Sequence, residues 1–173
     1  MTKKYSIEFL ESEGGSTQFY SIVGYKKIGF KEFANKRLAQ KSYSIQKKLA
    51  KLGLAPKVYG NLRKLPFKGT PYKSNWGYVT QIVKVGMKVS RKKIQHLVEQ
   101  IYEKTKLKFW DCHEYNIGKI GSGKDYKLVI IDTGPESFTR NVNAWGNENP
   151  GPKCSECDKL KCKCDWGFLD AIY

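Results

Sequence analysis

The chain has 173 residues and a formal net charge of +16, with 32 basic side chains against 16 acidic ones. Hydrophobic residues make up 40% of the sequence and aromatic residues 13%, which is enough for a folded core and excludes a disordered basic protein. No apolar run approaches the length of a membrane span and the N-terminus lacks a secretory leader pattern, so we expect a cytoplasmic protein without a membrane partner.

The first 34 residues alternate between apolar and polar side chains in the manner of β-strands. Gly14, Gly15 and Ser16 interrupt this pattern between the first two apolar segments. An ordinary hairpin turn explains these residues, and so does a loop whose backbone N–H groups approach an anion closely.

Two helices are predicted further along the chain. Residues 35–52 carry apolar side chains at helical spacing, and Ser90 is a good N-cap for a second helix that extends to about Thr105. Between the two helices, residues 77–83 predict a strand. His96 lies beside the apolar face of the second helix, and we interpret it as a surface or interface histidine rather than a catalytic one.

The most informative motif is Asp-Cys-His-Glu-Tyr-Asn at residues 111–116, followed by the apolar run 128–131 and then by Asp-Thr-Gly at 132–134. It places an Asp, an Asn five residues later and a second Asp sixteen residues after that Asn, where a β-branched strand ends. This is the residue chemistry of a Mg·ATP phosphotransfer site: one carboxylate orients or deprotonates a hydroxyl, while an amide oxygen and another carboxylate hold magnesium against the phosphates. The alternative is a solvated Asp/Asn turn followed by an unrelated buried strand.

The Asp-x-His-x-x-Asn spacing resembles the catalytic loop of aminoglycoside- and choline-type phosphotransferases, a small-molecule branch of the kinase fold. The Asp-Thr-Gly turn looks like the turn that supplies a metal ligand in these families. The resemblance implies that Asp111 is the catalytic base and that Asn116 and Asp132 are Mg²⁺ ligands. It also implies that His113 braces the loop.

The resemblance covers about residues 5–138 and implies an α+β fold. Residues 1–83 would be an N-lobe with an antiparallel sheet, a helix and a hinge, residues 84–149 a much reduced C-lobe, and residues 150–173 a cysteine-rich tail. Only residues 135–173 follow the metal-binding motif, so the acceptor platform would be very small, absent, or supplied by a partner or another subunit. A core this small would suit a compact viral genome, which would place the protein in the host cytoplasm or the virion.

The same resemblance assigns contacts to the nucleotide. Gly14, Gly15 and Ser16 correspond to the loop that covers the phosphates. Lys31 corresponds to the strand lysine that pairs with the phosphates, with Lys26 and Lys27 as nearby rivals. The alternative for Lys31 is one more surface lysine in a very basic chain.

The hinge and the lysine's partner complete the nucleotide contacts. Gln81 and Ile82 fall in the hinge that would accept the adenine edge. The glutamate that should pair with the lysine is absent, and its position falls on Gln46. Because a glutamine accepts a hydrogen bond but supplies no charge, the lysine–glutamate clamp would be missing or replaced.

The tail contains a separate cluster of four thiols within eleven residues: Cys154, Cys157, Cys162 and Cys164. Four cysteines are enough for a tetrahedral zinc site, and neighbouring lysines favour the thiolate forms that bind metal. Two disulfides or unligated thiols are the alternatives, and a reducing cytoplasm favours zinc over disulfides. Cys112 stands apart in the catalytic-loop motif, where we interpret it as a small filler rather than a nucleophile.

Positive charge is concentrated between residues 26 and 64, where twelve basic residues face one acidic residue, Glu32. Such a field attracts polyanions, so we expect an anionic partner such as nucleic acid or an acidic protein surface. The alternative is a solvated helix face.

Two functions from different classes follow. The first is an ATP- and Mg²⁺-dependent phosphotransferase that moves the γ-phosphate to an unidentified hydroxyl acceptor. The second is a catalytically inactive kinase-fold protein that binds nucleic acid or an acidic protein through its basic surface. Retention of Asp111, Asn116 and Asp132 together favours the enzyme, whereas Gln46 and the short C-lobe favour the binding protein.

Overall fold

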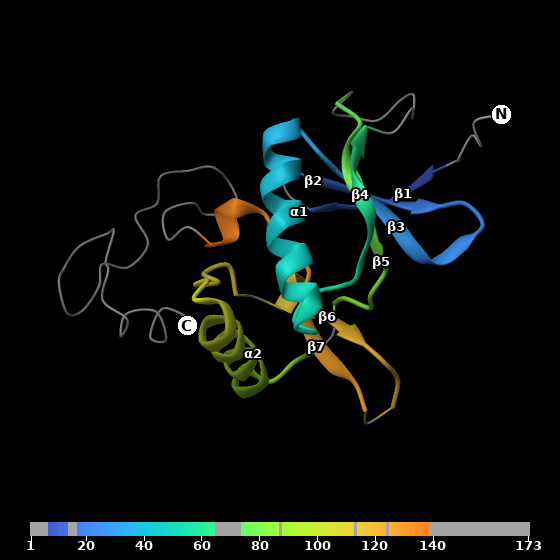
Figure 1. The fold of residues 1–173 in the computed structure, drawn as a ribbon. Coiled ribbons are helices and arrows are strands. Elements are labelled where there is room, and N and C mark those ends of the chain that lie inside the picture. Colours follow the sequence, from blue (N-terminus) through green and yellow to red (C-terminus); the bar gives the residue numbers. More distant parts are fainter. Residues whose placement is uncertain are drawn as a thin grey trace. The chain divides into compact units, whose positions relative to one another are not determined.

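The computed structural model describes residues 7–13, 17–64, 74–86, 88–112, 114–123 and 125–138. The chain divides into two compact units, Met1–Val83 and Lys84–Tyr173. The fold is α+β, as expected, with antiparallel strands and two α-helices in the described part of the chain (Figure 1). Neither of these helices is long and apolar enough to cross a membrane.

The first unit is a five-stranded antiparallel sheet with one helix packed on it. Its elements in chain order are β1 (Ile7–Glu13), β2 (Thr17–Ile22), β3 (Tyr25–Phe33), α1 (Lys36–Lys51), β4 (Val58–Lys64) and β5 (Trp76–Gln81). The strand order across the sheet is β1-β2-β3-β5-β4, so β3 is the central strand and β4 is an outer one. Helix α1 connects β3 to β4 and packs on β3, β4 and β5 (Figure 1).

Helix α1 forms where the amphipathic pattern predicts it, within one residue at each end. The side chain of Asn35 accepts a hydrogen bond of 3.0 Å from the Leu38 N–H and so caps the N-terminus. Gly53 follows the C-terminus with φ of +71°, a conformation that suits glycine. The buried face of the helix consists of Ala39, Ser42, Tyr43, Gln46 and Leu49.

The two faces of the sheet carry separate hydrophobic clusters, because successive residues of β3 point to opposite sides. Phe30 packs with Tyr20 and Ile22 on one face. Phe33 packs with Ala39, Tyr43 and Tyr78 on the face that α1 covers. The ring centroids of Phe33 and Tyr78 lie 5.6 Å apart, so aromatic stacking joins β3 to β5.

Glu32 is a fully buried carboxylate on β3. One of its oxygens accepts a hydrogen bond of 3.0 Å from the Tyr20 hydroxyl, and the other accepts one of 2.9 Å from the Asn75 N–H. These bonds tie β2 and the start of β5 to the central strand. They also compensate for part of the cost of removing the charge from water.

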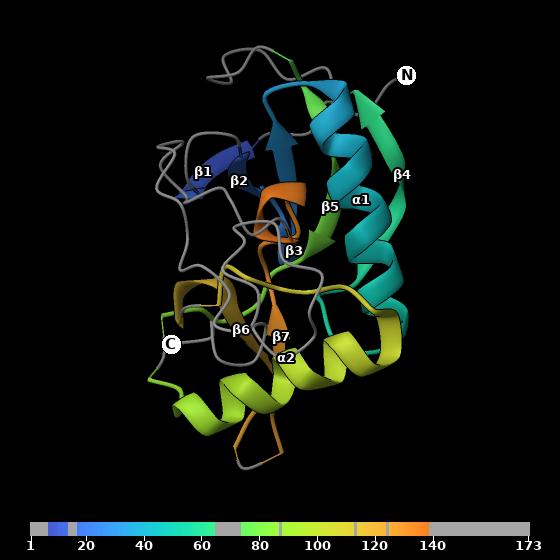
Figure 2. The same ribbon diagram turned by 90° about the vertical axis from the view of Figure 1, so that its left-hand side faces the viewer.

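The described part of the second unit, which ends at Phe138, contains one α-helix, one hairpin and two short 3₁₀ turns. They are α2 (Arg91–Thr105), η1 (Glu114–Asn116), β6 (Ile117–Ile120), β7 (Lys127–Ile130) and η2 (Pro135–Phe138). Helix α2 packs against β7, and β6 pairs with β7 in an antiparallel hairpin (Figure 2). Ser90 is the N-cap residue, as predicted, although its side chain makes no capping hydrogen bond.

We expect the Glu32→Ala variant to lower the free energy of unfolding by about 2–4 kcal/mol, because a buried donor on Tyr20 and a part-buried donor on Asn75 lose a charged acceptor. Urea denaturation followed by circular dichroism measures the change. Glu8→Ala is the control, since Glu8 is an exposed acid on β1. The control should change the free energy of unfolding by less than about 0.5 kcal/mol. Equal effects of the two substitutions would contradict a structural role for Glu32.

Candidate functional site

Ser137 holds together the segments that carry the predicted catalytic residues. Its backbone carbonyl accepts the N–H of Trp110 at 2.8 Å and the N–H of Asp111 at 3.4 Å. Its hydroxyl donates a hydrogen bond of 2.6 Å to Oδ2 of Asp132. Because Ser137 is 1% exposed, these bonds are shielded from water. Ser137, a buried residue of η2, therefore joins the Asp111 loop to Asp132, which lies two residues after the end of β7.

Asn116 connects the same loop to the end of β7. Its side-chain Nδ2 donates a hydrogen bond of 3.0 Å to the carbonyl of Asp111, and its own carbonyl accepts the N–H of Ile131 at 2.9 Å. With Nδ2 directed at the loop, Oδ1 is the side-chain atom that can accept from a donor or bind a cation. The register of the hairpin pairs Ile117 with Ile130, which sets Asn116 beside the end of β7.

Asp132 follows β7 and accepts hydrogen bonds through both carboxylate oxygens. Oδ1 accepts the Gly134 N–H at 2.9 Å, and Oδ2 accepts the Ser137 hydroxyl. These bonds give Asp132 a structural role as the cap of η2. They use about half of the lone-pair sites of a carboxylate, so the group keeps capacity for a cation.

The donor chemistry of this group fits Mg²⁺. Magnesium prefers oxygen ligands and is commonly held by one or two carboxylates together with the phosphates of a substrate. Asn116 and Asp132 supply one amide oxygen and one carboxylate from a single unit of the chain. Among the described residues, no three His, Cys, Asp or Glu side chains gather as a protein-only metal site. Oxygen atoms of water or of a substrate would complete the coordination of a Mg²⁺ held by these two residues.

Phe109 and Cys112 lie close to Asp111 in the sequence, and both are removed from water, Phe109 fully and Cys112 in part. Phe109 is fully buried, and its ring centroid lies 5.4 Å from that of Phe138. Burial, together with the neighbouring Asp111 carboxylate, raises the pKa of the Cys112 thiol from 9.0 to about 12. A thiol that stays protonated is a poor nucleophile, which agrees with Cys112 as a filler.

In the first unit, Lys31 is buried on the central strand. It is 2% exposed, whereas Lys26 and Lys27 are exposed. Its register partner is Tyr78, and its Nζ lies 5.8 Å from the centroid of the Phe33 ring. Lys31 is therefore not one more surface lysine, and its phosphate contact stays a prediction.

Gln46 is buried among three partners of its own unit. Its Nε2 donates to the Thr80 hydroxyl at 2.6 Å and to the Pro56 carbonyl at 3.1 Å, while its Oε1 accepts the Tyr78 hydroxyl at 2.8 Å. The amide thus connects α1 to β5 and to the segment before β4. Its predicted nucleotide contact stays a prediction, and these three bonds give Gln46 a structural role.

The predicted hinge residues lie at the end of β5, where Gln81 is the last residue of the strand and Ile82 follows it. The Gln81 N–H donates to the Lys57 carbonyl at 2.8 Å, and the Ile82 N–H donates to the Lys27 carbonyl at 2.9 Å. A backbone contact of adenine with Gln81 or Ile82 would therefore have to use a carbonyl oxygen rather than a backbone N–H.

Several predicted site residues lie outside the described residues. They are the loop-bracing His113, the phosphate-loop residues Gly14, Gly15 and Ser16, and the proposed zinc ligands Cys154, Cys157, Cys162 and Cys164.

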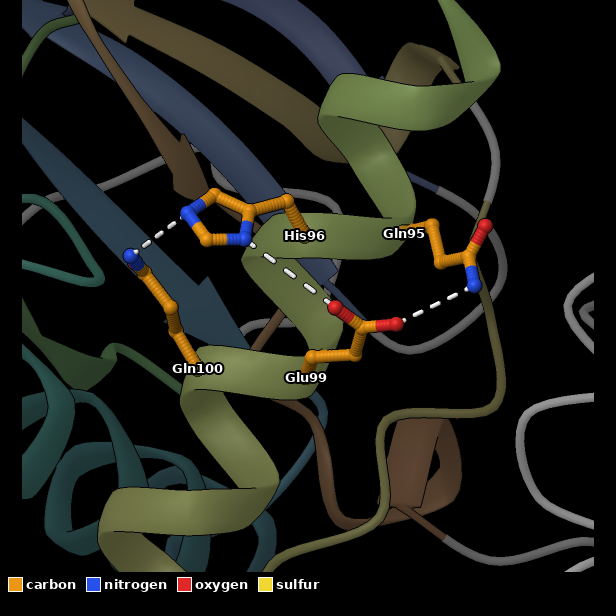
Figure 3. Close-up of polar contacts among 4 residues, drawn as sticks. All are labelled: Gln95, His96, Glu99 and Gln100. Carbon is orange, nitrogen blue, oxygen red and sulfur yellow. Dashed lines mark hydrogen bonds and ion pairs between the residues drawn. The ribbon is translucent and has the colours of Figure 1, made fainter.

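His96 lies on the solvent side of α2. Its side chain is 70% exposed, with Nδ1 at 4.0 Å from the Glu99 carboxylate and Nε2 at 3.0 Å from Nε2 of Gln100 (Figure 3). Glu99 also accepts a hydrogen bond from Gln95, so the three neighbours of His96 belong to its own helix (Figure 3). This matches the interpretation of His96 as a surface histidine.

Sequence reasoning missed Ser137 and Glu32. Ser137 acts largely through its carbonyl, which every residue type possesses, so its identity gave little signal. Its position five residues after Asp132 would have suggested a side-chain bond back to that carboxylate. Glu32 could have been suspected because it is the single acid in a basic stretch with strand alternation.

Comparison of the chain with protein-family models and with curated proteins finds no match.

We expect Cys112 to react with iodoacetamide roughly 10²–10³-fold more slowly in the folded chain than in urea at pH 8.5, because folding raises its pKa and depletes the thiolate. The folded rate should rise as the pH approaches 12. Mass spectrometry of the peptide that contains Cys112 measures both rates. Rapid labelling of the folded chain at pH 7 would contradict the raised pKa.

Proposed function

We propose that the protein is an ATP-dependent phosphotransferase whose Mg·ATP site is built on Asp111, Asn116 and Asp132, and that it moves the γ-phosphate to a hydroxyl acceptor. The observation that carries the proposal is the hydrogen-bond network of the second unit. It joins the Asp111 loop, Asn116 and Asp132 through Ser137 and the Ile131 N–H. The three residues named by the motif are thus connected by hydrogen bonds, Asp111 through its backbone and Asn116 and Asp132 through their side chains.

The order of elements supports a kinase-like fold. Three antiparallel strands, a helix and two further strands of the same sheet form the first unit. A helix, the Asp111 loop and a hairpin that ends before Asp-Thr-Gly form the described part of the second. This is the order that the resemblance implies for an N-lobe followed by a much reduced C-lobe.

Each residue has a distinct task in this proposal. The carboxylate of Asp111 would position the acceptor hydroxyl and take up its proton. Asn116 and Asp132 would hold Mg²⁺, which would neutralise charge on the phosphates. Ser137 would act as a positioning residue, because it fixes both the Asp111 backbone and the Asp132 carboxylate.

Gln46 favours a second candidate, a kinase-fold protein that binds a nucleotide without transferring phosphate. Its amide is neutral and is engaged by Tyr78, Thr80 and Pro56. A charged clamp on the lysine is therefore not supplied from this position. Nucleotide binding and turnover must be measured separately to distinguish the two candidates.

We expect the wild type to bind ATP only when Mg²⁺ is present, and Asp132→Asn to weaken this binding by at least about tenfold, the loss typical even for a residue that only supports a metal ligand. Isothermal titration calorimetry in a zinc-containing buffer measures both affinities. Asp125→Asn is the matched control, since Asp125 is an exposed acid between β6 and β7. Failure of the folded wild type to bind Mg·ATP would contradict the proposal.

We expect Asp111→Asn to bind Mg·ATP with nearly the wild-type affinity and to produce ADP roughly 10²–10⁴-fold more slowly, as expected for loss of a general base. A coupled assay of ADP release measures turnover to water or to the chain itself, so no acceptor has to be known. Binding without any ADP release above the protein-free rate would establish the second candidate instead.

A further inference from the structure

The solvent-facing side of α1 carries a strip of positive charge. Its six basic residues fall within roughly 140° of the helix circumference at 100° per residue and extend along about 24 Å of axis. They are all exposed, and the helix contains no acidic residue: Lys36, Arg37, Lys41, Lys47, Lys48 and Lys51. On the neighbouring strand β4, Lys64 is exposed as well, and it pairs with Trp76, which packs in the cluster that α1 covers. We call these seven residues the α1–β4 basic face.

The one acid in this part of the chain does not offset the charge. Between residues 26 and 64, eleven basic side chains are exposed, and Glu32, the single acid, is fully buried with its oxygens bonded to Tyr20 and Asn75. Folding thus removes the counter-charge from the surface. An uncompensated field of this kind attracts polyanions.

In its first turn, α1 carries charge that works against helix stability, whereas Lys48 and Lys51 in the last turn favour the macrodipole. Lys36 and Arg37 occupy the first turn, where positive charge opposes the helix macrodipole, and no acid in that turn offsets them. Helices stabilised for folding alone tend to carry acids at this end. A pattern that costs stability points to a role outside folding.

Within residues 17–64 and 74–86, the aromatic rings near the basic face are poorly placed for stacking on unpaired bases. Tyr43 is buried, and the Trp76 ring is half-buried with the Lys36 ammonium 4.7 Å from its centroid. Tyr59 is exposed but pairs with Val79, which packs in the cluster on the other side of the sheet from α1. Single-strand binding normally depends on exposed aromatic platforms, whereas duplex binding can rest on phosphate contacts alone.

We propose that the α1–β4 basic face binds a nucleic-acid duplex through its phosphates, without reading the sequence of bases. The basic side chains recur along α1 at intervals of about one to two turns, and a duplex presents its phosphates at regular intervals along each strand. The proposal is independent of the nucleotide site, since its residues all belong to the first unit.

The test is a fluorescence anisotropy titration of the full chain with labelled 24-base-pair DNA and RNA duplexes and a 24-nucleotide single strand. Wild type should bind a duplex more tightly than the single strand. The affinities for the DNA duplex and the RNA duplex, compared with each other, identify which of the two is preferred. Tighter binding of the single strand would overturn the proposal.

The variant Arg37→Gln/Lys41→Gln removes two exposed charges of the basic face. We expect it to bind the preferred duplex roughly 10–100-fold more weakly at 0.1 M salt. For a DNA duplex, the plot of log affinity against log salt should also become less steep by about 1.8, because two phosphate contacts are lost. Glutamine is a good helix former, so α1 should persist, which circular dichroism checks.

The matched control is Lys92→Gln/Lys104→Gln, which removes two exposed lysines from α2 and lowers the net charge by the same amount. Its duplex affinity should stay within about twofold of the wild type. Equal losses in the two double variants would mean that net charge alone drives binding, and would overturn the proposal. Labelled poly-glutamate that binds more tightly than either duplex would identify an acidic protein as the partner, and would also overturn it.

Discussion

The second unit depends on one buried carbonyl. Ser137 accepts the N–H groups of Trp110 and Asp111 through this oxygen, while its hydroxyl bonds to Asp132. A loop that comes before the β6–β7 hairpin and a turn that comes after it are thereby fixed to each other. The Asn116 carbonyl makes a second connection of this kind, because it accepts a hydrogen bond from the N–H of Ile131, the residue after β7. Because most of these bonds use backbone atoms, the arrangement of the site follows from the path of the chain, and the side chains determine its chemistry.

The fold was predictable where the signal is local. Helix α1 and the strands follow from the period of apolar residues, and the capping Asn35 and Gly53 stand at the boundaries of α1 in the sequence itself. The choice of Asp111, Asn116 and Asp132 rested on residue type and spacing, and their role in a metal–nucleotide site stays a prediction. Ser137 and Glu32 act through partners that are distant in the sequence. A pattern of residue types does not indicate which distant donor bonds to a given acceptor.

Burial, as much as composition, determines which charged side chains lie on the surface of the first unit. The sheet removes Lys31 and Glu32 from water, although they are adjacent in sequence and point to opposite faces. Exposed lysines remain on α1 and β4 with no exposed acid among residues 26–64. The same strand therefore buries a lysine on one face and, on the other, the one acidic residue of positions 26–64. This division separates a candidate nucleotide contact from a candidate polyanion surface within one small sheet.

The most direct test of the central claim is an NMR titration with a Mn²⁺·nucleotide complex, which replaces Mg²⁺ by a paramagnetic ion with the same preference for oxygen ligands. We expect the amide signals of Asn116, Asp132 and Gly134 to broaden first, and excess Mg²⁺·nucleotide to restore them. Broadening that begins elsewhere in the chain and leaves these three amides sharp would show that Asp111, Asn116 and Asp132 do not form the metal–nucleotide site.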